Sequence, residues 1–128
     1  MNPSIPAPRP RSPHLQIYRP QWSSVLSITH RLSGVLLVLL LVAWLWWLMA
    51  LADGPDRHAD FMALAGTAPL RVLWGLLAWA LFFHLFNGIR HLLWDAGWLL
   101  ELPAARRSGY LVVLAATLAA AWYWRALA

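Results

Sequence analysis

The feature that most constrains this chain is a charge-free, almost entirely apolar run from Leu32 to Ala52. A helix of about 20 such residues crosses the ~30 Å hydrocarbon core of a membrane. Of the 128 residues, 61% are hydrophobic and only 12% are charged, whereas a soluble domain carries about 25% charged residues. A water-soluble fold of this size cannot hide so much apolar surface. We therefore expect a single-domain, all-α integral membrane protein.

Two further apolar runs, Val72–Trp94 and Gly109–Trp124, predict a bundle of three membrane-spanning helices. Pro20 keeps the first helix from starting earlier, and a serine at position 23 or 24 is a suitable N-cap. The predicted elements are an extended segment over 1–22, helices over 23–52, 72–98 and 109–127, an outer loop over 53–71 and a cytoplasmic loop over 99–108.

All ten basic residues are arginines, and most of them lie at the ends of the apolar runs. Arginines precede the first helix, and Arg106 and Arg107 lie between the second and third helices. The positive-inside rule places these segments in the cytoplasm. The N-terminus is then cytoplasmic, and the C-terminus and the 53–71 loop are outside. This pattern indicates membrane topology and not nucleic-acid binding.

The chain has no cysteine, so it can neither form disulfides nor ligate an iron–sulfur cluster. The first 20 residues lack the apolar core of a signal peptide and do not form an amphipathic transit peptide. From this we expect a multi-pass protein of the bacterial inner (cytoplasmic) membrane.

The second predicted helix carries a polar stripe. At ~100° per residue, His84, Gly88, His91 and Asp95 fall within roughly 40° of one another. Ionisable residues inside a membrane usually mark function, although His84 alone could also be a packed, hydrogen-bonded histidine. Arg90 points away from the stripe, and we expect it to extend to the lipid headgroups.

The first predicted helix has a matching stripe of Ser27, Arg31 and Gly34, with His30 about 60° from Ser27. Antiparallel helices bring the two stripes to the same end of the membrane. Arg31 alone could extend to the headgroups, and His30 could be simply interfacial. Asp95 lies in the last turn of its helix, where the macrodipole disfavours an anion, so we expect it to contact Arg31.

A histidine near mid-membrane with cationic groups nearer the water suits haem. His84 is the candidate axial ligand of the haem iron, and His30, Arg31 and His91 are the candidates for binding its propionates. His84 and His91 share a face, so they cannot ligate one iron from opposite sides. His30 is expected to lie too near the surface to oppose His84, and the third helix has no histidine. The chain therefore carries half of a haem site.

Two stretches give this pattern a family context. The sequence "RPRSPHLQIYRPQWSSVLSITHRLSGV" (Arg9–Val35) resembles the N-terminal signature of succinate dehydrogenase cytochrome b subunits, and "HLFNGIRHLLWDAGW" (His84–Trp98) resembles their second signature. The two stretches occur in the same order on a three-span chain, and the third helix matches only in character.

The resemblance implies a membrane anchor of succinate:quinone oxidoreductase (complex II), the enzyme that passes electrons from succinate oxidation to ubiquinone. Such an anchor pairs with a second three-helix anchor and docks an iron–sulfur subunit and a flavoprotein subunit. The dicarboxylate site lies in the flavoprotein, so the anchor itself is not catalytic. One haem b is shared between the two anchors.

Carried over by residue, the resemblance makes His84 the axial ligand and places Ser27 and Arg31 in the quinone site. Asp95, as the expected partner of Arg31, completes the quinone-site candidates. A hydroxyl and a guanidinium at the membrane edge suit a quinone carbonyl, because that oxygen gains negative charge as electrons arrive.

Two other functions remain open at this stage. The same architecture serves fumarate reduction with a different quinone, and the sequence does not set the direction of electron flow. A haemless membrane scaffold or assembly protein would use the polar stripes only to hold helices together. A transporter is disfavoured, because three spans without an internal repeat offer no pair of alternating halves.

Overall fold

The computed structural model describes residues 17–127, which form four helices and no strand. The helices are α1 (Trp22–Ala52), α2 (Pro55–Ala65), α3 (Ala68–Asp95) and α4 (Leu102–Leu127). The all-α prediction is confirmed for these residues. The number of helices was predicted as three, and the structure adds α2. The extended segment expected over 1–22 lies mostly outside the described residues, as do the first eight residues of the Arg9–Val35 stretch.

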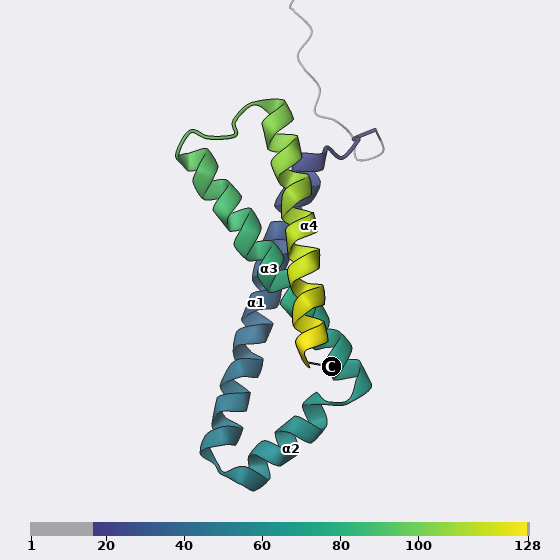
Figure 1. The fold of residues 1–128 in the computed structure, drawn as a ribbon, viewed down its shortest axis with the longest axis vertical. Coiled ribbons are helices and arrows are strands. Elements are labelled where there is room, and N and C mark those ends of the chain that lie inside the picture. The colour runs from purple at the N-terminus through teal and green to yellow at the C-terminus, as the bar shows by residue number, and fades with distance from the viewer. Residues whose placement is uncertain (1–16, 128) are drawn as a thin grey trace, which may run out of the picture.

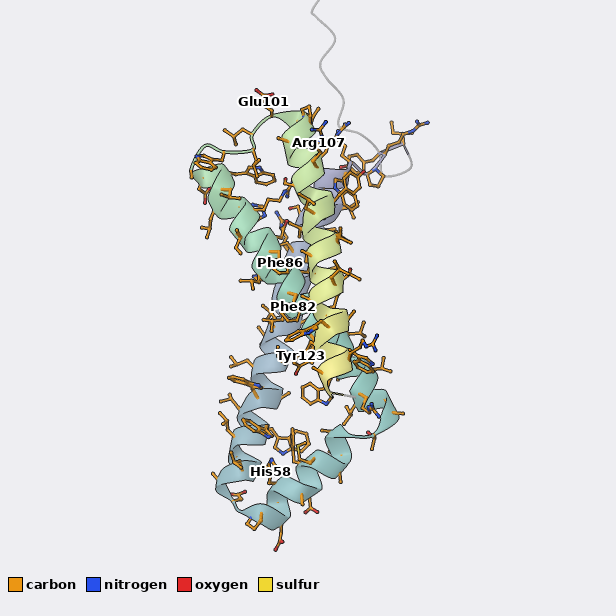
Figure 2. The ribbon with its side chains drawn as sticks, viewed as in Figure 1. His58, Phe82, Phe86, Glu101, Arg107 and Tyr123 are labelled. Atoms are coloured by element: carbon orange, nitrogen blue, oxygen red, sulfur yellow. The ribbon has the colours of Figure 1, made fainter. Side chains whose placement is uncertain are left out.

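The added helix α2 lies where the sequence predicted an outer loop. Gly54 has a φ of 111°, which side-chain-bearing residues rarely adopt, and it separates α1 from α2. Pro55 then begins α2, since the first turn of a helix needs no amide donor from it. Phe61 packs edge-on against Trp46 with ring centroids 5.1 Å apart, and α2 thus folds back against the end of α1 (Figures 1 and 2).

The other predicted boundaries shift by a few residues. The first helix begins after Gln21, and no serine caps it. Instead, the Ser24 hydroxyl accepts a hydrogen bond from Tyr18 at 3.1 Å. The second long helix covers 68–95 and not 72–98, and α4 begins seven residues before the expected position 109. The sequence-based boundary of α4 was set by its arginines, but charged residues are compatible with a helix that extends beyond the hydrocarbon.

The long helices cross instead of running parallel (Figure 1). The first turns of α1 and the segment between α3 and α4 lie at one end, and α2 lies at the other. The buried core is formed near the crossing by Leu26, Phe83, Val112 and Ala116. At Gly109, an added Cβ would lie 2.5 Å from Leu26 Cδ1, so α4 can approach α1 this closely only without a side chain.

The helices α1 and α3 are each long and apolar enough to cross a membrane. In the most apolar 18-residue part of α1, only 6% of the residues are buried within this chain. Most of the α1 surface is therefore apolar and uncovered, which suits contact with lipid or with another apolar helix.

Candidate functional site

The centre of the candidate site is His84, which projects from α3 toward α1. Its Nδ1 lies 3.0 Å from Ser33 Oγ and 3.3 Å from the backbone oxygen of His30. Ser33 is 2% exposed, so this contact lies inside the helix pair. Among residues 17–127, no hydrogen bond is made by His84 Nε2. His84 is thus held through one ring nitrogen, and the other is available to a ligand.

Three imidazoles gather around this point. The His30 and His84 rings stack with centroids 4.0 Å apart and planes 16° apart, and His91 lies 5.2 Å from His30. His30 was expected to lie nearer the membrane surface than His84. That expectation is wrong, because the crossing of α1 and α3 brings the two rings face to face. Nitrogen lone pairs lie in the ring plane, so two stacked rings still do not ligate one iron from opposite sides.

The local packing leaves room for a flat group beside His84. An added Cβ on Gly88, one turn after His84 on α3, would meet no atom within 4 Å. His30 Nδ1 is buried and has no hydrogen-bond partner in the described part of the chain, and buried polar atoms are normally paired. A free His84 nitrogen, an open glycine surface and an unpaired buried nitrogen together fit a planar ligand with polar substituents, such as haem.

Arg90 does not extend to the headgroups as the sequence predicted. It is 4% exposed, and it donates from Nε to Ser108 Oγ at 2.9 Å and from Nη2 to the Ala105 backbone oxygen at 2.8 Å. Its guanidinium also lies 3.9 Å from the ring centroid of Trp94. Arg90 does point away from the stripe of His84, as the helical wheel predicted. However, α4 covers that side of α3, and the guanidinium there donates hydrogen bonds to carbonyl and hydroxyl oxygens of α4.

Asn87 connects this arginine to the histidine cluster. It is fully buried; its Oδ1 accepts from Arg90 Nη1 at 3.3 Å, and its Nδ2 lies 3.3 Å from His91 Nε2. Sequence reasoning missed both Asn87 and Ser33. A buried amide and hydroxyl inside apolar helices are themselves a signal, because such groups need partners in a membrane.

The quinone-site candidates lie on the uncovered surface. Ser27 and Arg31 are exposed on α1, and Asp95 is exposed at the end of α3. The expected contact between Arg31 and Asp95 is not formed, since no ion pair joins them. This chain alone therefore presents Ser27 and Arg31 without enclosing a ligand between them.

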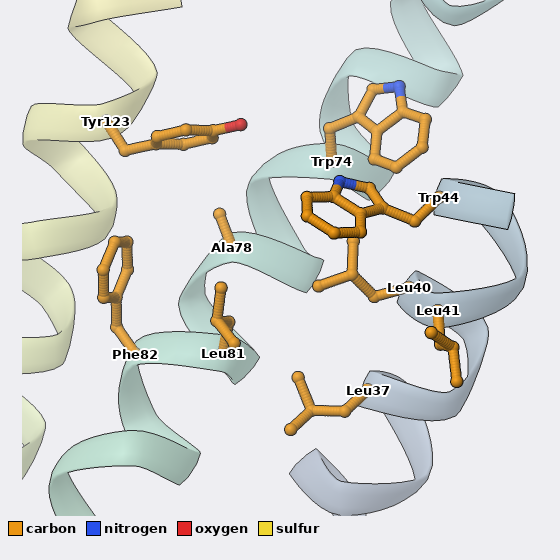
Figure 3. A pocket seen from close by; sticks show the side chains of 9 residues that line it. All are labelled: Leu37, Leu40, Leu41, Trp44, Trp74, Ala78, Leu81, Phe82 and Tyr123. Carbon is orange, nitrogen blue, oxygen red and sulfur yellow. The ribbon is translucent and has the colours of Figure 1, made fainter. Parts of the chain in front are cut away.

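An apolar cleft of about 470 Å³ opens between α1, α3 and α4, on the α2 side of the histidines (Figure 3). Leu37, Trp44, Trp74 and Phe82 are among its lining residues, and no histidine or carboxylate lines it. Apart from the indole nitrogens of Trp44 and Trp74 and the hydroxyl of Tyr123, the cleft is lined by apolar side chains, with no imidazole and no charged group. We therefore separate it from the histidine site.

The fold and the site define an all-helical membrane protein with a cluster of imidazoles between two candidate spans. A model of the succinate dehydrogenase/fumarate reductase transmembrane subunit family matches residues 6–122. The chain belongs to this family.

Curated relatives agree with this assignment. The chain is 36% identical over 116 residues to the succinate dehydrogenase cytochrome b556 subunit of Rickettsia prowazekii, covering 91% of this chain and 90% of the relative. It is 38% identical over 107 residues to the cytochrome b556 subunit of Paracoccus denitrificans, covering 82% and 81%. It is 39% identical over 113 residues to the cytochrome b560 subunit of Reclinomonas americana, covering 82% and 76%.

Proposed function

We propose that this chain is the cytochrome b membrane-anchor subunit of succinate dehydrogenase and that it binds one haem b together with a second anchor subunit. The family match and the relatives named as cytochrome b subunits support the anchor assignment. The observation that carries the haem proposal is the His84 ring, which is held at Nδ1 by α1 and free at Nε2.

The roles of the other histidines follow from their positions around His84. We propose that His84 Nε2 is an axial ligand, and that His30, Arg31 and His91 bind the propionates. The unpaired Nδ1 of His30 supports this role, because a propionate oxygen would give it a partner. We propose that the second axial ligand comes from the second anchor subunit, since His30 and His91, the two histidines that the described residues bring near His84, lie beside its ring. A bound haem supplies one-electron transfer within the membrane.

We further propose that Ser27 and Arg31 bind ubiquinone at the membrane edge, with Asp95 as a weaker candidate. A reduced quinone oxygen carries developing charge, to which Arg31 donates a charge-assisted hydrogen bond and Ser27 a neutral one. Both side chains are exposed on α1. The remaining wall of this site would come from partner subunits, with the iron–sulfur subunit supplying electrons from the flavoprotein.

The proposed topology places the N-terminus and the α3–α4 segment in the cytoplasm of a bacterial cell and α2 outside. Three spans are proposed: α1, α3 and α4. In α4 the charge-free stretch is short, from Ser108 to Trp124, yet it falls within the ~17–25 residues that suffice for a span. The proximity of the α1 start to the α3–α4 segment supports this arrangement (Figure 1).

The optical spectrum of membranes tests the haem proposal. Co-expression with the second anchor subunit should give a reduced b-type haem band, whereas this chain alone should bind haem weakly because it offers one axial ligand. Stoichiometric low-spin haem in the isolated chain would contradict the shared site. No b-type band from the assembled complex would favour a haemless scaffold.

A further inference from the structure

We infer that Ser33 is a positioning residue for the haem: it fixes His84 in the tautomer that leaves Nε2 free for iron. This inference rests on the proposed axial role of His84. Ser33 lies on α1, one turn after His30, and is 2% exposed. It therefore reaches His84 from the neighbouring helix inside the protein.

The direction of each hydrogen bond follows from the partners. Ser33 Oγ lies 2.7 Å from the His30 backbone oxygen, which can only accept, so the single hydroxyl hydrogen of Ser33 points there. Ser33 can then only accept from His84 Nδ1 at 3.0 Å. The His30 oxygen, 3.3 Å from the same nitrogen, also accepts. Both neighbours require a hydrogen on Nδ1.

A neutral imidazole carries one ring hydrogen, so a hydrogen on Nδ1 leaves a lone pair on Nε2. Second-shell acceptors of this kind fix the tautomer of a ligating histidine and raise its basicity as a ligand. A more basic ligand favours ferric over ferrous iron and lowers the reduction potential. Gly34 helps to permit this geometry, because a Cβ there would lie only 3.3 Å from His84 Cε1.

The alternative is that Ser33 only holds α1 and α3 together by a polar contact. That role predicts lost stability but no change in the potential of whatever haem remains bound. The haem reduction potential therefore separates a positioning residue from a structural one.

The test uses the assembled complex in membranes with Ser33→Ala, Ser33→Thr and, as a matched control in the same helix, Ser23→Ala at an exposed position. Ser33→Ala should lower haem affinity about tenfold, at the low end for second-shell changes because the His30 oxygen remains. The preference for ferric iron should fall about threefold, a rise of about 30 mV since tenfold is 59 mV for one electron. Ser33→Thr, which keeps the hydroxyl, and Ser23→Ala should leave the potential unchanged.

An unchanged potential of the bound haem in Ser33→Ala, whatever the haem content, would overturn the inference, as would an equal shift in Ser33→Thr. If Ser33→Ala does not assemble, ¹⁵N NMR of the histidine-labelled chain in micelles decides. The wild-type His84 should show only the Nδ1–H tautomer and Ser33→Ala a mixture, and identical tautomers would overturn the inference. His84→Ala separates a failure of the Ser33 inference from a failure of the proposed axial role of His84: if this variant keeps its low-spin haem, the axial role itself fails.

Discussion

Arg90 Nε donates a hydrogen bond to Ser108 Oγ at 2.9 Å and thereby joins the last turns of α3 to the first turns of α4. The Ser108 hydroxyl in turn donates to the Ala105 backbone oxygen at 3.0 Å, which also accepts from Arg90 Nη2. The Arg90 cation, which would be costly in hydrocarbon, thus has its hydrogen-bond partners on α4. The same chain of contacts continues from Arg90 through Asn87 to His91. The helix junction and the histidine site belong to one polar network.

Removing the guanidinium should therefore loosen the α3–α4 junction. Arg90→Met retains most of the side-chain length but leaves the buried Asn87 Oδ1 without its donor, which typically costs about 1–3 kcal/mol. It also removes the charged donor to Ser108 Oγ and to the Ala105 oxygen. We expect a destabilisation of about 2–4 kcal/mol. The measurement is the thermal midpoint of the detergent-purified complex. Arg107→Met, at an exposed position nearby, is the control and should change the midpoint little.

The part of the fold that follows from hydrophobicity was predictable, because long charge-free runs have few alternatives to a helix. The short helix α2 was not predictable in this way: it has only 11 residues and carries Asp56, Arg57, His58 and Asp60 among its apolar ones. Its Phe61 is buried because α2 folds back onto Trp46. The helical wheel gave the stripe of His84, Gly88 and His91, but not the crossing that stacks His30 on His84. The environment of Arg90 depends on which face α4 covers, which a single helix cannot reveal.

Two glycines should respond oppositely to the same substitution. A Cβ at Gly109 would lie 2.5 Å from Leu26 Cδ1 and 2.7 Å from Trp22 Nε1, so Gly109→Ala should destabilise the chain by about 1–3 kcal/mol. Gly88→Ala meets open space and should be neutral or stabilise the haem-free chain by up to about 1 kcal/mol.

In the haem-loaded complex, Gly88→Ala should be harmful, although it is neutral or stabilising in the haem-free chain. If the open surface at Gly88 lies against the haem, Gly88→Ala should lower the haem content of the complex without lowering the stability of the haem-free chain. Thermal unfolding in micelles and haem content measure the two effects separately. A Gly88→Ala complex with full haem content would place the haem elsewhere.

The proposed topology can be checked without background labelling, because the chain contains no cysteine. Single substitutions Asp60→Cys in α2 and Arg106→Cys in α4 place a thiol at exposed positions near opposite ends of the molecule. In intact spheroplasts, a membrane-impermeant maleimide should label the first and not the second, and in inside-out vesicles the pattern should reverse. Labelling of Arg106→Cys in spheroplasts would invert the proposed orientation.

The axial role of His84 predicts a specific spectral loss. His84→Ala removes the Nε2 proposed as the axial ligand, and the complex should lose its haem or retain it in a high-spin form. His58→Ala is a suitable control, because His58 lies in α2 and accepts a hydrogen bond from Trp47 at 3.3 Å away from the site. A low-spin spectrum in His84→Ala equal to that of the wild type would exclude the assignment.

The quinone proposal predicts that substitutions at Ser27 and Arg31 impair electron transfer to ubiquinone but not the oxidation of succinate. Ser27 and Arg31 are one helical turn apart, at ~40° around the axis and ~6 Å along it, so both can reach one headgroup. Losing a donor to a developing oxyanion typically lowers the rate about 10²–10³-fold. Arg31→Leu should therefore strongly reduce succinate:ubiquinone turnover while leaving succinate oxidation by an artificial flavin-level acceptor nearly intact. Ser27→Ala should have a smaller effect, because neutral hydrogen bonds contribute roughly half as much as charged ones.

Paired assays on membranes with equal amounts of assembled complex measure this difference. Arg19→Leu, which removes the same charge from an exposed position just before α1, is the matched control and should leave both activities unchanged. Haem spectra of Arg31→Leu must accompany the rates, because Arg31 is also a propionate candidate. If both activities fall together, Arg31 stabilises the assembly and does not act on the quinone. If neither falls, the quinone binds elsewhere and Arg31 simply extends to the headgroups, as an exposed arginine at a membrane edge commonly does.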